Sequence, residues 1–107
     1  MRKLHWIVLA ALILPGAVYA EPPESRQTEL IYRVRHDCGS CHGMTLKGGL
    51  GPSLLPAAIA ARSDDVLANV ILNGLPGTPM PPWDFEISRE EAEWLVHRLK
   101  EGLDGRQ

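Results

Sequence analysis

Two cysteines and a histidine lie within five residues of this sequence, in the run Cys38-Gly-Ser-Cys41-His42. Two thiols about one helical turn apart can each add to one vinyl group of a haem, and the histidine that follows can then bind the iron. The spacing is typical of c-type haem attachment. It predicts one covalently bound haem c, with Cys38 and Cys41 as thioethers and His42 as the proximal iron ligand.

Other uses of these three residues fit the sequence less well. A redox motif of the thioredoxin type belongs in an alternating α/β pattern, and the sequence shows no such pattern. A structural zinc site needs four ligands, usually with a second close pair, and only these three residues cluster. The chain has two cysteines in all, and haem attachment uses both.

A second ligand must come from elsewhere in the chain if the iron is six-coordinate. The candidates are Met44, Met80, His36 and His97. Met44 and His36 lie so close to the attachment site that they are confined to one side of the ring. His97 falls off the apolar stripe of the last predicted helix, as a surface histidine does.

Met80 is the candidate whose position favours ligation. It lies 38 residues beyond His42, which is enough chain to pass around the ring. It sits in the run Gly77-Thr-Pro-Met-Pro-Pro82, where flanking prolines fix φ and hold an extended loop. A lone methionine often fills a gap in a core, but a methionine in a rigid loop is better placed as the distal iron ligand.

Three helices are predicted to position these residues. The first spans Thr28 to about Asp37, with its apolar residues within one arc. The second begins after the cap Ser63 and ends at Gly74. Its expected buried stripe is Val66, Leu67, Val70 and Ile71. The third begins at the capping box of Ser88 and Glu91 and ends near Gly102. Its apolar face is Ala92, Leu95, Val96, Leu99 and Leu103.

The connecting segments read as loops. Residues 43–61 are rich in glycine and proline, and residues 75–85 carry four prolines. No period-2 alternation of useful length appears, so we expect an all-α fold of three or four short helices with long loops. Residues 28–107 would form one domain, and residues 21–27 a flexible lead-in.

The N-terminus reads as an export signal. Arg2 and Lys3 precede an apolar run, 7–14, which is followed by a small-residue cleavage site ending at Ala20. The run is too short to span a bilayer, so we expect residues 1–20 to be removed and no stable membrane insertion. The remaining chain would lie in the periplasm. Its net charge becomes −4, which argues against nucleic acid as a partner.

The order of these features resembles the class I cytochromes c over nearly the whole exported chain. The resemblance implies that the fold wraps around one haem and that Pro52, after Gly51, accepts a hydrogen bond from His42. It also implies that the first and last helices cross, with Leu30 and Val34 against Leu95 and Leu99. An exposed haem edge would be the partner surface, with nearby apolar residues Leu46, Leu50, Leu75 and Pro76.

Two longer runs, CGSCHGMTLKGGLGPSL and NGLPGTPMPPW, resemble the cytochromes c55X of denitrification gene clusters more narrowly. That resemblance implies electron exchange with the cytochrome cd1 nitrite reductase, or electron acceptance during haem d1 assembly, by a monomeric carrier that is not an enzyme.

Two other classes of function remain open. One is a gas-binding sensor or small haem enzyme, which requires Met80 to be absent from the iron. The other is a haem-delivery protein. Trp83 could pack on the ring or support Met80, and Trp94 could contact a partner or lie partly covered on the surface.

Overall fold

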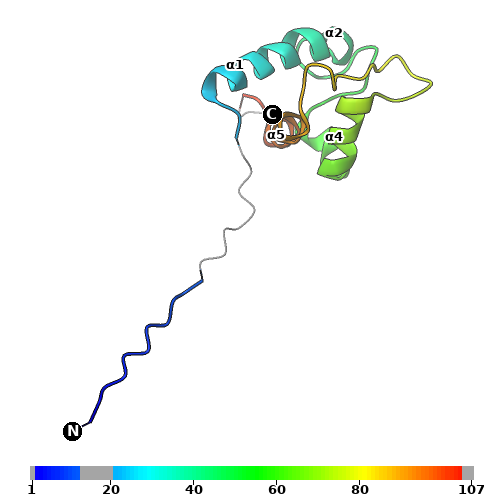
Figure 1. The fold of residues 1–107 in the computed structure, drawn as a ribbon. Helices are drawn as coiled ribbons and strands as arrows, with labels where there is room; N and C mark the ends of the chain where they lie inside the picture. The colour runs from blue at the N-terminus through cyan, green and yellow to red at the C-terminus, as the bar shows by residue number, and fades with distance from the viewer. Residues whose placement is uncertain (1, 13–20, 105–107) are drawn as a thin grey trace.

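The chain after residue 20 folds into helices joined by loops. The computed structural model describes residues 2–12 and 21–104, and within these ranges it contains no β-strand, which confirms the all-α prediction. Residues 2–12 form no helix, and their large apolar side chains are exposed (Figure 1). The expected cleavage site at Ala20 lies outside the described residues. Over the two described ranges no helix has the length and apolar character to cross a membrane.

The first helical segment is longer than predicted at both ends. α1 (Glu24–Arg33), a π-helical turn η1 (Val34–Cys38) and α2 (Gly39–His42) follow one another without a break (Figure 1). The flexible lead-in predicted for residues 21–27 is therefore wrong over 24–27. Arg26, in the first turns of α1, pairs with Glu29 in the same helix and with Glu91 of α5, and the second, tertiary contact overrides the polar composition.

The predicted end of this helix near Asp37 is also wrong. The backbone stays in the right-handed helical region at Cys38 and Gly39, and it leaves that region at Gly43, where φ is +91°. A side chain there would be strained and would also press on the backbone of Gly48, at 2.7 Å from its oxygen. The whole attachment motif therefore lies on the last turns of one helical segment.

The two later helices begin and end where the sequence predicts. In α4 (Asp64–Asn73) the Ser63 hydroxyl accepts a hydrogen bond from the Val66 N–H at 3.3 Å, and Gly74 follows the last turn. In α5 (Arg89–Glu101) Ser88 and Glu91 form both hydrogen bonds of a capping box. One short helix, α3 (Pro56–Ile59), lies within the region predicted as loop and buries Ile59.

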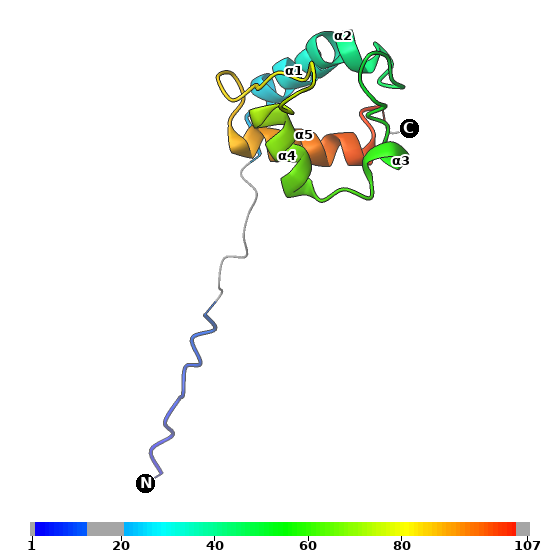
Figure 2. The ribbon, with the colours of Figure 1, turned by 90° about the vertical axis from the view of Figure 1, so that its right-hand side faces the viewer.

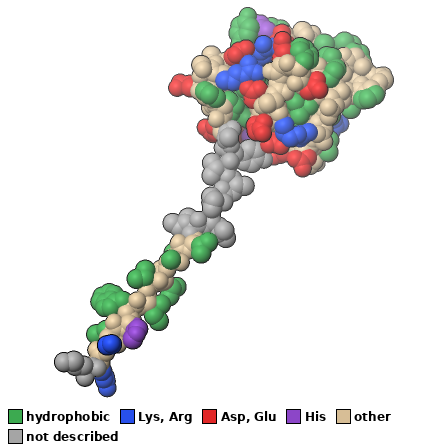
Figure 3. All heavy atoms as spheres, in the orientation of Figure 1, with side chains coloured by type: hydrophobic (Ala, Val, Ile, Leu, Met, Phe, Trp, Pro, Cys, Tyr) green, Lys and Arg blue, Asp and Glu red, His purple; other side chains and the backbone are tan. Residues whose placement is uncertain are grey.

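The core lies where the first and last helices cross. Figures 1 and 2 show α5 running across the α1–α2 segment. Leu30 and Val34 belong to the same buried cluster as Leu95, Val96 and Leu99, as expected from the family resemblance. Arg26 and Arg33 add ion pairs from α1 to Glu91 and Glu86. On the surface, basic and acidic side chains lie side by side (Figure 3).

The expected buried stripe of α4 is wrong in part. The residues that α4 buries in the core are Ala68 and Leu72, whereas Val66 is half exposed. Leu67, Val70 and Ile71 line a cavity instead. α4 has two apolar faces because it lies between the core and this cavity, and helical periodicity alone does not separate the two faces.

Candidate haem site

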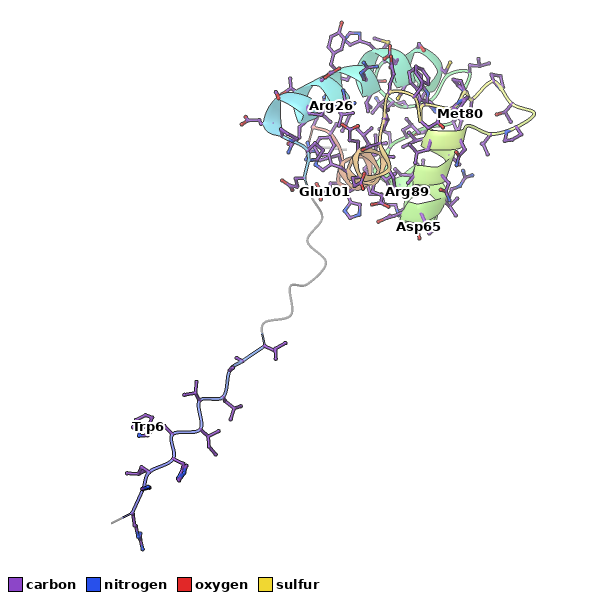
Figure 4. All side chains as sticks on the ribbon, viewed as in Figure 1. Trp6, Arg26, Asp65, Met80, Arg89 and Glu101 are labelled. Carbon is purple, nitrogen blue, oxygen red and sulfur yellow. The ribbon has the colours of Figure 1, made fainter. Side chains whose placement is uncertain are left out.

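A cavity of about 710 Å³ lies between the attachment motif, the loop after it, α4 and the loop that carries Met80. This volume falls within the range of about 300–1,000 Å³ that is usual for small-molecule and cofactor sites. Figure 4 shows Met80 on the loop that follows α4. Most of the lining is apolar, and its side chains include Leu54, Ile59, Leu67, Val70, Ile71, Trp83, Ile87, Leu95 and Leu99.

The three residues of the attachment motif all line this cavity. Cys38, Cys41 and His42 do not converge on one point that could hold a metal ion, and no other group of three such residues does so within residues 2–12 and 21–104. Their arrangement therefore suits a large ring better than a single zinc ion.

The thiol of Cys38 is protonated at neutral pH before any haem is attached. Burial, together with the charge of Asp37, raises its pKa to about 11. A redox-active dithiol depends on a thiolate that is stabilised by its surroundings, and here the surroundings oppose it. This observation adds to the sequence argument against a thioredoxin-type site.

The ring of His42 is held with one nitrogen free. Its Nδ1 lies 2.7 Å from the carbonyl oxygen of Pro52. A carbonyl can only accept a hydrogen bond, so Nδ1 carries the proton and Nε2 keeps its lone pair. The hydrogen bond expected between His42 and Pro52 is thus present, and it leaves His42 in the tautomer that a metal ligand needs.

Gly51 packs flat against the same imidazole. A Cβ at this position would lie 2.8 Å from Cε1 and 2.9 Å from Nδ1 of His42. Contacts this short force the ring to move, so only glycine fits beside the ring in its present position. The sequence reasoning used Gly51 only as the partner of Pro52. Its position directly before a proline and nine residues after the histidine was the signal that a close approach was needed.

Leu46 is not part of an exposed partner surface, and that expectation is wrong. Its side chain is 1% exposed and belongs to the core. Its backbone is left-handed, with φ at +61°, and its carbonyl accepts hydrogen bonds from the Leu54 N–H and the Ser53 hydroxyl. The turn after His42 thus points Leu46 inward. Leu50 and Leu75, in contrast, are exposed as expected.

Met80 is partly buried and lines the cavity with His42. Its backbone N–H donates to the Thr78 hydroxyl at 3.3 Å, and its carbonyl accepts from the Leu75 N–H at 3.2 Å. The loop therefore closes on itself around this methionine. Thr78 was not singled out from the sequence.

The other possible ligands are placed less favourably. Met44 is 58% exposed and does not line the cavity. His97 has its Nε2 3.0 Å from a carboxylate oxygen of Asp64 and lies outside the lining, in agreement with a surface histidine. His36 does contribute to the lining, but its side chain is exposed and its ring lies 4.1 Å from that of Tyr32.

The two tryptophans differ in their surroundings. Trp83 lines the cavity, and its ring stacks on Phe85 with 6.0 Å between centroids. Trp94 is partly buried against the core, and the guanidinium of Arg98 lies 5.9 Å from its ring centroid. Trp83 is thus placed to pack on a bound ring, and Trp94 is a partly covered surface side chain away from the cavity.

Together these residues fit a covalently bound haem. Two thiols, an imidazole with a free Nε2 and a thioether line one apolar cavity of suitable volume. Imidazole and thioether are an established pair of axial ligands in cytochromes c. The absence of a side chain at Gly51 is explained by the need to hold the imidazole in one orientation.

Comparisons with known proteins agree with this chemistry. The family model described as cytochrome C oxidase, cbb3-type, subunit III matches residues 24–97. The chain is 46% identical over 100 residues to cytochrome c55X of Pseudomonas aeruginosa, covering 91% of this chain and 84% of that protein. The solved structure of the c-type cytochrome NirC superposes with a TM-score of 0.74 at 48% identity, over 76% of this chain and 95% of that one.

A larger protein contains a similar segment. The dihydro-heme d1 dehydrogenase of Pseudomonas aeruginosa is 35% identical over 96 residues, which is 90% of this chain but 19% of that enzyme.

Proposed function

We propose that this chain, which belongs to the c-type cytochromes, carries single electrons between larger redox proteins. Its fold is the small cytochrome c fold, and it holds one haem c covalently. The haem iron supplies a reversible one-electron change between Fe(II) and Fe(III). The observation that carries the proposal is that His42, with Nε2 free, and Met80 line one cavity together with both cysteines.

Each residue has a defined part in this proposal. Cys38 and Cys41 hold the ring as thioethers, and His42 and Met80 bind the iron through Nε2 and sulfur. The Pro52 carbonyl fixes the imidazole and makes it a stronger donor. The neutral thioether of Met80 favours Fe(II) and raises the potential. The apolar lining would pack against the faces of the ring.

If His42 and Met80 both bind the iron, no ligand position would be left for a substrate or a gas. The ferric protein is then expected to be low-spin with a methionine-to-iron charge-transfer band, and the reduced protein is expected not to bind carbon monoxide. Met80→Ala should remove the band, lower the potential and allow carbon monoxide to bind.

Met44→Ala is the matched control for this experiment. Met44 is exposed and lies off the cavity, so its removal should change none of the three properties. A high-spin wild-type protein that binds carbon monoxide, or a Met80→Ala spectrum identical to that of the wild type, would refute the ligand assignment. The first of these outcomes would favour a gas-binding sensor or a small haem enzyme.

We further propose that the carrier works in denitrification. The support is the similarity to cytochrome c55X and to part of a dihydro-heme d1 dehydrogenase. Dehydrogenation releases two electrons and two protons, and a monohaem carrier accepts one electron, so two ferric molecules would be reduced for each dihydro-haem oxidised, with the two protons passing to solvent. The other candidate partner is the cytochrome cd1 nitrite reductase, which the reduced carrier would supply with electrons.

Stopped-flow mixing separates the two partners. Ferric carrier mixed with the dehydrogenase and its dihydro-haem should be reduced at two carriers per substrate if the chain serves haem d1 assembly. Reduced carrier mixed with the nitrite reductase and nitrite should be reoxidised within seconds if it serves respiration. Failure of both reactions would exclude a role with either enzyme while leaving the electron-carrier proposal intact.

The proposed location is the periplasm, reached after removal of residues 1–20. The exported protein should begin at Glu21 and should be recovered coloured in the periplasmic fraction. An uncut N-terminus in a coloured membrane fraction would contradict this proposal.

A further inference from the structure

We propose that Gly74 and Thr78 position Met80 and so determine how firmly its sulfur stays on the iron. The inference rests on the role given to Met80 in the proposed function. Both residues act on the backbone of Met80, and not on its side chain.

Gly74 allows the end of α4 to touch the ligand loop backbone to backbone. Its φ is +67°, and a Cβ there would lie 2.5 Å from the carbonyl oxygen of Met80. The same Cβ would lie 2.9 Å from the carbonyl carbon of Pro81 and from the nitrogen of Pro82. All three contacts are with main-chain atoms, so no side-chain rotation can relieve them, and any side chain at Gly74 must separate the end of α4 from the backbone of residues 80–82.

Thr78 holds the other end of the same residue. Its hydroxyl donates to the Leu75 carbonyl at 2.7 Å and accepts from the Met80 N–H at 3.3 Å. Because its neighbours in 79–82 are prolines, Met80 is the one residue of that run with a backbone N–H. That single donor is satisfied by Thr78. The Leu75 N–H then closes the loop on the Met80 carbonyl at 3.2 Å.

These contacts restrain the N–H and the carbonyl of Met80 at once. The loop between Leu75 and Met80 is otherwise exposed, so little side-chain packing holds it in place. Removing either restraint should let the loop move, and methionine should leave the iron more often. Because the thioether stabilises Fe(II), its looser binding should lower the potential.

Gly77 provides a matched control within the same loop. Its φ is +80°, close to that of Gly74, but a Cβ there meets nothing within 4 Å. Alanine at either position would adopt an unfavourable positive φ, at Gly74 together with ψ at −172°, and only Gly74→Ala also collides with the main chain at Met80. In the holoprotein, Gly74→Ala should weaken the methionine-to-iron band and increase carbon monoxide affinity of the reduced protein at least tenfold. Gly77→Ala should keep the wild-type values.

A second pair of variants tests the hydroxyl. Thr78→Val keeps the shape and removes both hydrogen bonds, whereas Thr78→Ser keeps the hydroxyl. The Val variant should shift the Fe(III)/Fe(II) equilibrium about tenfold toward Fe(III), which corresponds to about 59 mV for one electron. The Ser variant should restore most of the wild-type potential and band.

The outcomes separate this inference from the proposed function. If the wild-type protein lacks the methionine-to-iron band, the assignment of Met80 as a ligand is refuted, and so is this inference. If the wild type shows the band but Gly74→Ala and Gly77→Ala behave alike, the Gly74 restraint is refuted alone. If Gly74→Ala does not accumulate as holoprotein, the Thr78 pair decides, and equal spectra and potentials for Val and Ser overturn the inference.

Discussion

Replacing Gly51 with alanine tests whether the geometry around His42 is needed. The new Cβ would lie 2.8 Å from Cε1, 2.9 Å from Nδ1 and 3.2 Å from Nε2 of the imidazole. The ring cannot move away freely, because Nδ1 is bonded to Pro52 and Nε2 faces the iron in the proposed holoprotein. Relief of the clash therefore displaces either the 50–53 loop or the ring.

The expected cost has two parts. Forcing an extra carbon into a packed site costs about 1–3 kcal/mol. Weakening the hydrogen bond to Pro52 costs about 1 kcal/mol more, so the free energy of unfolding should fall by about 2–4 kcal/mol. The potential should rise, because an imidazole that donates a weaker hydrogen bond is a poorer electron donor and favours Fe(II).

Guanidinium unfolding of the ferric holoprotein measures the change in the free energy of unfolding, and redox titration measures the change in the potential. Gly39→Ala is the control, because Gly39 is helical with φ at −61° and its nearest contacts are ordinary, at 3.5 Å. Alanine there should raise the free energy of unfolding by about 0.5–1 kcal/mol. If Gly51→Ala unfolds at the same denaturant concentration as the wild type, with an unchanged potential, the close packing on His42 has no energetic consequence and the reasoning fails.

Three further results are expected. The hydrogen bond from Arg26 lowers the pKa of Glu91, so the stability that this carboxylate contributes is present above its unfolded pKa of about 4.3 and is lost as pH falls through the lower folded value. In the Glu91→Gln variant, the free energy of unfolding measured with urea should therefore fall less steeply toward acid pH. An unchanged pH dependence would exclude the Arg26–Glu91 pair as a contributor. Leu46→Gly should be about 1 kcal/mol less destabilising than Leu46→Ala in the same assay. The reason is that φ at position 46 is +61°, where alanine keeps the backbone strain and glycine removes it. The opposite order would show that this backbone strain is negligible. The chain made without haem should be largely unfolded by circular dichroism, because the partly exposed apolar side chains of the lining, such as Val70, Ile71 and Trp83, would lose the ring that covers them; a cooperative melt of the haem-free chain would contradict this.

Local chemistry was predictable from the sequence wherever neighbouring residues decide it. The helix caps at Ser63 and Ser88 depend on residues within one turn, and the structure has them as predicted. The attachment motif and the proline-flanked Met80 could be recognised in the same way, because their chemistry is carried by adjacent residues.

The parts that were missed depend on residues distant in sequence. Leu46 was placed on the surface because nothing local reveals that its left-handed turn points it into the core. The early start of α1 depends on Arg26 reaching Glu91, which lies 65 residues away. Gly51 lies against the ring of His42 and Gly74 against the backbone of residues 80–82, and these close approaches depend on how the loops fold.

The π-helical turn η1 fixes the angle between the two ends of the first helical segment. Its hydrogen bond runs from the Gly39 N–H to the Val34 carbonyl, five residues back, so it holds one residue more than an α-helical turn. Val34, at the start of this turn, is buried in the core and also lines the cavity, and Cys38, at its end, lines the same cavity with Cys41 and His42. Deleting a single residue from 34–38 would leave a regular helix but rotate Cys38 through His42 by about 100° relative to the core. The number of residues between Val34 and the attachment motif is therefore as strongly constrained as the motif itself. This constraint acts on the length of the turn and requires no particular side chain within it.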